Sequence, residues 1–194
     1  LISEKIPGSP LVWLIAVIAA RLIYFGYISL LLYQQDKRGF LTKAWGTLAF
    51  IKFKRYLLWI WTIDAAAIVI SIIKFQSEFS LQLALPFMIL GFVFVVVGFS
   101  SKLLAKKIVG ERGYNYYDYF DNKEKPEEAS NKKGIYKYFK NPMYGLGYLQ
   151  VYGFAFLCLS IRGLIIAVFA QVLIYTFHFL VENPHLSRIY QKNT

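Results

Sequence analysis

The fold of this chain is decided by a long apolar stretch, LVWLIAVIAARLIYFGYISLLLY, which occupies residues 11–33. Its 23 residues include one charged side chain, Arg21. A helix needs about 17–25 apolar residues to cross the hydrocarbon core of a bilayer, and it satisfies its own backbone polar groups in lipid. The stretch therefore predicts a membrane-spanning helix.

Four further stretches meet the same criterion, at residues 56–73, 81–101, 144–160 and 163–181. No run shows the period-2 alternation of a membrane β-barrel. We expect an all-α fold, a polytopic membrane helical bundle of about five transmembrane helices, in a single domain over residues 1–194. Only Ile161 and Arg162 separate the last two stretches, so these should form a tight helical hairpin.

The composition agrees with a membrane protein and excludes two other classes. The chain is 57% hydrophobic and 17% charged, whereas soluble domains are about 45–50% apolar and about 25% charged. This excludes a soluble globular domain and a disordered chain. The net charge of +11 would suggest nucleic acid in a soluble protein, but here we interpret it as a topology signal and expect no nucleic-acid partner.

Basic residues fall mainly on one side of the predicted membrane. The loop at 34–55 holds six Lys and Arg, the loop at 102–143 holds ten, and the tail after Val181 holds two. The opposite side carries Lys5, Lys74 and Arg162. The positive-inside rule makes the first side cytosolic or, in a mitochondrion, matrix-facing. Within the large loop, residues 122–133 are expected to be solvated.

Two charged residues lie where lipid should exclude them. Arg21 is near the middle of the first predicted span, and Asp64 is near the middle of the second. An ionised group at that depth costs at least ~2.5–3.5 kcal/mol. Because the two helices are consecutive and antiparallel, we predict an Arg21–Asp64 ion pair that acts as a structural clamp.

A first motif, NPMYGLG at residues 141–147, stands at the entrance to the fourth span. Asn is a favoured N-cap and Pro a favoured first helical residue, so a helix is expected to begin at Asn141 and Pro142. Gly145 and Gly147 would then lie in its first two turns, where free N–H groups favour a carboxylate or phosphate. The alternative is that the glycines form a notch for helix packing.

A second motif, VENPH at residues 181–185, ends the fifth span. Pro184 is expected to stop the helix at Asn183. Glu182 would then sit at a helix C-terminus, where the dipole repels an anion and the carboxylate needs a cationic or hydroxyl-bearing partner. The predicted topology brings Glu182 and the two glycines to the same face of the membrane.

These motifs together resemble the phospholipid N-methyltransferases, such as the phosphatidylethanolamine methyltransferases of the endoplasmic reticulum. The resemblance covers residues 110–190 and rests on the order and spacing of five short segments: Gly113-Tyr114, 117–120, 141–147, 182–185 and Ile189-Tyr190. It implies that residues 102–194 form the catalytic-type half of the chain.

The resemblance also implies a cofactor, S-adenosylmethionine, bound by a Gly-x-Gly motif and a glutamate pair. Gly145 and Gly147 match the first motif, and Glu182 matches the first glutamate. Asn183 stands where the family commonly has the second glutamate. Its amide can make hydrogen bonds but brings no charge. We further expect Tyr144 to contact the cofactor.

For the acceptor, the resemblance implies a membrane phospholipid whose amine is methylated, with Tyr119 and Asn141 as substrate contacts. An ammonium group has no lone pair for attack, so it must first lose a proton. Asp118 and His185 are the candidate bases. His178, Glu182 and His185 have the spacing of a metal ligand set, but with a helix break expected at Pro184 we predict no metal site.

Two alternatives remain open at this point. The same fold and cofactor would serve an isoprenylcysteine-type carboxyl methyltransferase. Asn183 also fits a methyltransferase-like subunit that is retained for packing with other membrane subunits. The resemblance favours the endoplasmic reticulum membrane, and the charge asymmetry is equally compatible with a mitochondrial membrane.

Overall fold

The computed structural model describes residues 2–76, 81–120, 134–139 and 141–191, and all regular secondary structure in these residues is helical. This confirms the all-α fold class. The solvated excursion predicted at 122–133 lies outside the described residues. In chain order the elements are α1 (Ile2–Lys5), α2 (Pro10–Arg38), α3 (Phe40–Trp45), η1 (Gly46–Leu48), α4 (Ala49–Lys74), α5 (Leu81–Tyr114), η2 (Tyr117–Tyr119), η4 (Gly134–Lys137), η5 (Leu146–Tyr148), α6 (Leu149–Leu157), α7 (Ile161–Phe177), the π-helix η6 (His178–Glu182) and α8 (Asn183–Gln191).

Four of the described helical segments are long and apolar enough to cross a membrane: Pro10–Arg38, Phe40–Lys74, Ala84–Gly110 and Ile161–Arg188. Their outward faces carry large apolar side chains, among them Trp59, Leu85 and Leu103. A soluble protein avoids exposing apolar surface of this extent, whereas lipid solvates it.

Local sequence sets the ends of the first long helix. Ser9 caps α2 by accepting a hydrogen bond from the Val12 amide, and Pro10 is its first residue. Gly39 ends it in the left-handed region, with φ of 61°, and its N–H donates to the Gln35 carbonyl. That conformation favours glycine, and it turns the chain sharply into α3.

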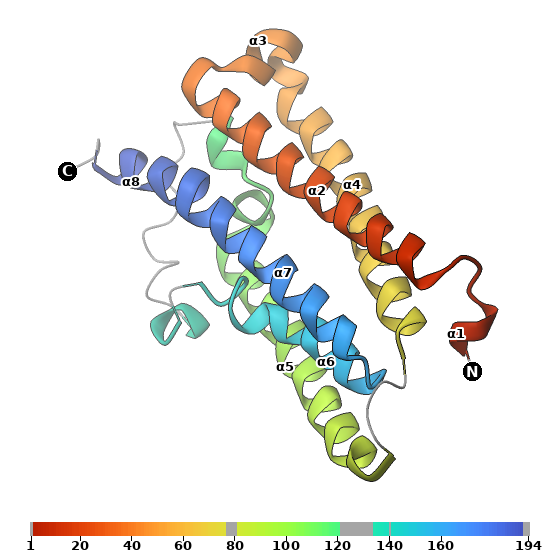
Figure 1. The fold of residues 1–194 in the computed structure, drawn as a ribbon. Coiled ribbons are helices and arrows are strands. Elements are labelled where there is room, and N and C mark those ends of the chain that lie inside the picture. The colour runs from red at the N-terminus through yellow and green to blue at the C-terminus, as the bar shows by residue number, and fades with distance from the viewer. Residues whose placement is uncertain (1, 77–80, 121–133, 140, 192–194) are drawn as a thin grey trace.

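Contacts at the two ends of the bundle agree with the topology predicted from charge. At one end, Asp36 of α2 pairs with His185 and Arg188 of α8. At the other end, Lys74 donates to the Ile6 carbonyl over 2.8 Å. Figure 1 shows the same arrangement, with α3 and α8 at one end and α1 at the other.

The fourth predicted span, residues 144–160, is a shorter helix than expected. The apolar segment Leu146–Leu157 is about 18 Å long at 1.5 Å per residue, against a hydrocarbon core of about 30 Å. The helix start predicted at Asn141 is wrong. Residues 141–145 form turns instead, closed by hydrogen bonds from Gly145 N to Asn141 O and from Gly147 N to Pro142 O.

Glycines bring α6 against α5 at backbone distance. A Cβ atom on Gly153 would lie 2.6 Å from the Gly91 carbonyl oxygen, and one on Gly91 would lie 2.8 Å from the Gly153 oxygen. Small residues at such crossings let membrane helices approach closely enough for backbone packing. The crossing holds the short α6 in the bundle.

The predicted Arg21–Asp64 ion pair is confirmed. The Arg21 Nη2 and Asp64 Oδ2 atoms are 2.8 Å apart, and the residues are 5% and 2% exposed. Arg21 Nη1 also donates to the Tyr148 hydroxyl over 3.3 Å. The guanidinium therefore ties α2 to α4 and to η5, the short helix that precedes α6.

Removing one partner of this pair should destabilise the bundle far more than removing both. We expect Asp64→Leu to lower the free energy of unfolding by about 3–5 kcal/mol, because it leaves a buried cation uncompensated. Arg21→Met combined with Asp64→Leu should recover most of that loss. Thermal unfolding in detergent measures both, with the lipid-facing Thr62→Val as control. A double variant as unstable as Asp64→Leu would contradict the clamp.

Candidate functional site

A chain of three polar side chains connects the two motifs. The Asn141 Nδ2 and His178 Nε2 atoms are 2.9 Å apart, and the His178 Nδ1 and Glu182 Oε2 atoms are 2.7 Å apart. Because an amide nitrogen only donates, His178 Nε2 must accept, and its Nδ1–H then donates to the carboxylate. The imidazole thus holds Glu182 in one orientation and joins it to the start of the first motif.

Several tyrosine side chains lie near enough to this carboxylate to feel its charge. The Tyr144 and His178 ring centroids are 5.5 Å apart, and the Tyr116 and Tyr119 ring centroids are 6.5 Å apart. Burial raises the pKa of Tyr116 and of Tyr119, and the negative charge of Glu182 raises both further. The same two causes raise the pKa of Tyr136 to about 12. These tyrosines stay neutral, so Glu182 supplies a negative charge beside aromatic rings, a combination that suits a cation.

The helix end predicted at Asn183 is wrong. The chain widens into the π-helical turn η6, in which the Asn183 N–H donates to the His178 carbonyl, and it then continues as α8 to Gln191. Pro184 is the second residue of α8, directly after the π-turn, and it does not end the helix. Glu182 is therefore held by a side chain rather than placed at a free helix C-terminus.

The space beside the Gly-x-Gly motif is tight at Gly147 and less so at Gly145. A Cβ atom on Gly147 would lie 2.8 Å from Lys102 Cγ, and one on Gly145 would lie 3.2 Å from the Tyr175 hydroxyl. Gly145 precedes η5 and Gly147 lies inside it, outside the α-helix that was expected there. The structure therefore favours the packing interpretation of Gly147.

His185 lies apart from the Asn141–His178–Glu182 chain. It is 3% exposed, its Nδ1 is 2.6 Å from Asp36 Oδ1, and its ring stacks on Tyr119 with centroids 3.7 Å apart. Arg188 holds the other Asp36 oxygen. The three residues with metal-ligand spacing are thus divided, since His178 and Glu182 bind each other and His185 binds Asp36. Among the described residues there is no group of three or more His, Cys, Asp or Glu placed to hold a metal.

The other predicted site residues are less central. Asn183 is exposed. The position where the family commonly has its second glutamate therefore takes no part in the hydrogen bonds that join Asn141, His178 and Glu182. Asp118 lies half-buried in η2. Tyr119, which follows it, is buried and donates from its hydroxyl to the Val181 carbonyl over 3.2 Å.

Comparison with known proteins identifies the family. Residues 86–193, more than half of the chain, match the model of the family described as phospholipid methyltransferase. The chain belongs to the phospholipid methyltransferase family. This confirms the resemblance drawn from the motifs, and the matched region contains the whole Asn141–His178–Glu182 chain.

The similar curated proteins are much longer than this one. Phosphatidylethanolamine N-methyltransferase of Clavispora lusitaniae is 33% identical over 103 residues, and that of Scheffersomyces stipitis is 32% identical over 103 residues. The enzyme of that name from Saccharomyces cerevisiae strain RM11-1a is 29% identical over 106 residues. Each match covers 53–55% of this chain, which spans 12% of the length of these relatives. No solved structure matches the chain significantly.

Several residues of this candidate site carry no clear signal in the sequence. From the sequence, His178 has only the spacing of a metal ligand, and no pattern singles out Tyr116, Tyr136 or Asp36. His178 and Glu182 are spaced i, i+4, a spacing that indicates a pair on one helix face. Asp36 lies 149 residues before its partner His185, and no local sequence pattern predicts such a contact.

A rescue experiment tests the packing role of Gly147. We expect Gly147→Ala to destabilise the protein by about 1–3 kcal/mol, because the new methyl group overlaps Lys102. Lys102→Ala in the same molecule should relieve the overlap. Gly26→Ala is the matched control, because a Cβ atom at Gly26 meets nothing within 4 Å. If Lys102→Ala leaves the defect of Gly147→Ala unchanged, the packing explanation fails.

Proposed function

We propose that this protein catalyses S-adenosylmethionine-dependent N-methylation of phosphatidylethanolamine or its methylated intermediates. Membership of the phospholipid methyltransferase family and the names of the relatives support the reaction class. The observation that carries the proposal is the Glu182 carboxylate, oriented by His178 near several tyrosines and joined to Asn141.

The residues present suit the cofactor's chemistry. S-adenosylmethionine supplies an electrophilic methyl group on a sulfonium cation, and it also carries an ammonium group and ribose hydroxyls. Glu182 would take the ammonium or the ribose, because a carboxylate makes strong charge-assisted hydrogen bonds. Tyr144, Tyr116 and the backbone at Gly145 would line the same site, where the aromatic rings favour a cation.

The acceptor would reach the site from the bilayer. The Asn141–His178–Glu182 chain lies toward the end of the bundle that carries most of the basic loops, so a headgroup can enter while its acyl chains stay in lipid. Tyr119 and Asn141 are the side chains assigned to the headgroup. We propose an endoplasmic reticulum membrane, or a mitochondrial one, with this end facing the cytosol or matrix.

His185 is the better candidate for the base that removes the acceptor's proton. Its Nδ1 is bound to Asp36, while its buried Nε2 has no hydrogen-bond partner among the described residues. A carboxylate on Nδ1 holds an imidazole in the tautomer whose Nε2 accepts a proton. Asp36 is then a positioning residue, and Asp118 is the alternative base.

Cofactor binding gives the first test. We expect Glu182→Gln to weaken S-adenosylmethionine binding about 10- to 100-fold, which corresponds to the loss of one charge-assisted hydrogen bond. Equilibrium dialysis with labelled cofactor measures this without requiring turnover. Asn183→Gln is the control, and it should bind the cofactor as the wild type does because Asn183 is exposed.

Identifying the labelled product separates the candidate reactions. Label should enter the phosphatidylethanolamine of mixed vesicles and not a prenylated peptide with a free carboxylate. Label in the peptide alone would favour the carboxyl methyltransferase. Absence of both binding and transfer by a stable wild-type protein would favour the packing subunit.

A pH–rate profile tests the base. His185→Gln should lower kcat about 10²- to 10⁴-fold and flatten the acidic limb of the profile, because no group then takes the proton. Asp36→Asn should have a smaller effect in the same direction. Arg188→Gln, which removes the other partner of Asp36, controls for loss of the α2–α8 contact. An unchanged profile in folded His185→Gln would exclude His185 and leave Asp118.

A further inference from the structure

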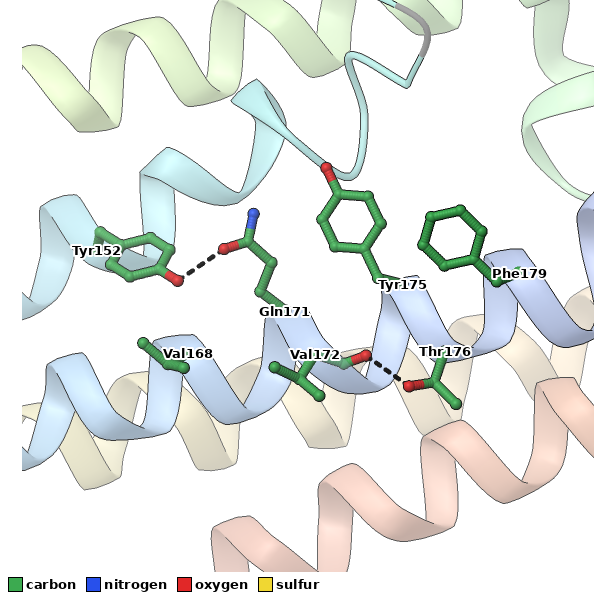
Figure 2. A pocket seen from close by; sticks show the side chains of 7 residues that line it. All are labelled: Tyr152, Val168, Gln171, Val172, Tyr175, Thr176 and Phe179. Atoms are coloured by element: carbon green, nitrogen blue, oxygen red, sulfur yellow. Dashed lines mark hydrogen bonds between the residues drawn. The ribbon is translucent and has the colours of Figure 1, made fainter.

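A groove of about 370 Å³ lies along α7, between that helix and Tyr152 of α6. One wall is a helical stripe that runs from Val168, Val172 and Tyr175 of α7 to Phe179 of η6, and Tyr152 of α6 forms the other side. Figure 2 shows these side chains projecting from the two helices toward a common space. The stripe covers eleven residue steps, or about 16 Å along the helix.

One wall of the groove is polar, which is unusual for a surface that faces lipid. The Tyr152 hydroxyl donates to Gln171 Oε1 over 2.6 Å, and Gln171 Nε2 donates to the Tyr144 carbonyl over 3.0 Å. The Tyr175 hydroxyl reaches the turn before α6 (Figure 2), 3.2 Å from where a Cβ atom of Gly145 would lie. Hydroxyl and amide groups are thus present at membrane depth beside an apolar trough.

The groove opens to the bilayer at one side and meets the candidate site at its end. Val172 is 56% exposed, and Val168 and Phe179 are also exposed, so lipid contacts this face. Tyr175 lies between the groove and the site, with its ring 6.5 Å from Tyr144 and 6.0 Å from Phe179. Phe179 in turn packs against His178. A molecule lying in the groove therefore has one end beside His178 and Glu182.

From this geometry we infer that the groove binds the diacylglycerol part of the acceptor phospholipid, with one acyl chain along α7 and the ester region at the polar wall. The inference rests on the proposed function and specifies how its substrate is held. Hydrocarbon is the available occupant of an apolar trough that faces lipid, and ester carbonyls accept hydrogen bonds from hydroxyl groups such as that of Tyr175. A chain in this position directs its headgroup toward His178 and Glu182.

Blocking the groove tests the inference. Val172→Trp should fill the trough and raise the KM for phosphatidylethanolamine about tenfold or more, because losing contact with a few methylenes costs that much affinity. Cofactor affinity should not change. Ile165→Trp is the matched control, because Ile165 is exposed on the same helix but does not line the groove.

Photocrosslinking gives a readout that does not depend on turnover. Full-length protein in vesicles would receive phosphatidylethanolamine with a diazirine in one acyl chain, and crosslinked peptides would be located by mass spectrometry. Crosslinks should fall within residues 168–179 in the wild type and in Ile165→Trp, be competed by unlabelled phosphatidylethanolamine, and decline in Val172→Trp.

The outcomes distinguish the groove from the proposed function. Methylation without crosslinks in residues 168–179, or an unchanged KM in Val172→Trp, overturns the groove and leaves the methyltransferase standing. Competable crosslinks in a protein that methylates no lipid support the groove and remove the proposed function. Crosslinks that unlabelled phosphatidylethanolamine does not compete indicate surrounding bilayer lipid only, and they overturn the inference.

Discussion

The site depends on one requirement of the bilayer, that backbone polar groups at membrane depth must be bonded within the protein. The turn before α6 lies beside Gln171, ten residues along α7 and so about 15 Å from its start. Its amides at Gly145 and Gly147 bond within the turn, and Gln171 takes the Tyr144 carbonyl. Because these bonds are satisfied, the chain can leave helical geometry inside the bundle and bring Asn141 to His178.

Two groups of charged side chains, one in the middle of the bundle and one toward its basic end, have different roles. Arg21 and Asp64 neutralise each other between α2 and α4, and Arg21 also donates to the Tyr148 hydroxyl, just after the turn. Toward the basic end, His178 orients Glu182 but leaves its negative charge, which acts on the nearby tyrosines. The first arrangement stabilises the bundle, whereas the second is suited to binding a cation.

The predicted ion pair was confirmed and the predicted helix boundaries were not, and each outcome has a physical reason. The Arg21–Asp64 pair was predictable because an isolated charge in lipid is costly and two helices of known direction offer one partner each. The helix boundaries at Asn141 and Asn183 were wrong because capping and proline rules use only the local sequence and take no account of contacts with distant helices. In the folded chain, turns stabilised by Gln171 and by the glycine contacts replace the first boundary. A π-turn that admits Pro184 in the next helix replaces the second.

The sequence by itself determined the all-helical architecture with helices long enough to span a membrane, the grouping of its loops at the two ends of the bundle, and the family, because hydrophobic length, charge distribution and short motifs are local properties of the chain. Only the tertiary structure decided that α6 is short, that His178 connects Asn141 to Glu182, and that Asp36 binds His185. These features depend on the packing of helices far apart in sequence. That packing follows from glycine contacts and buried hydrogen bonds whose partners no local pattern specifies.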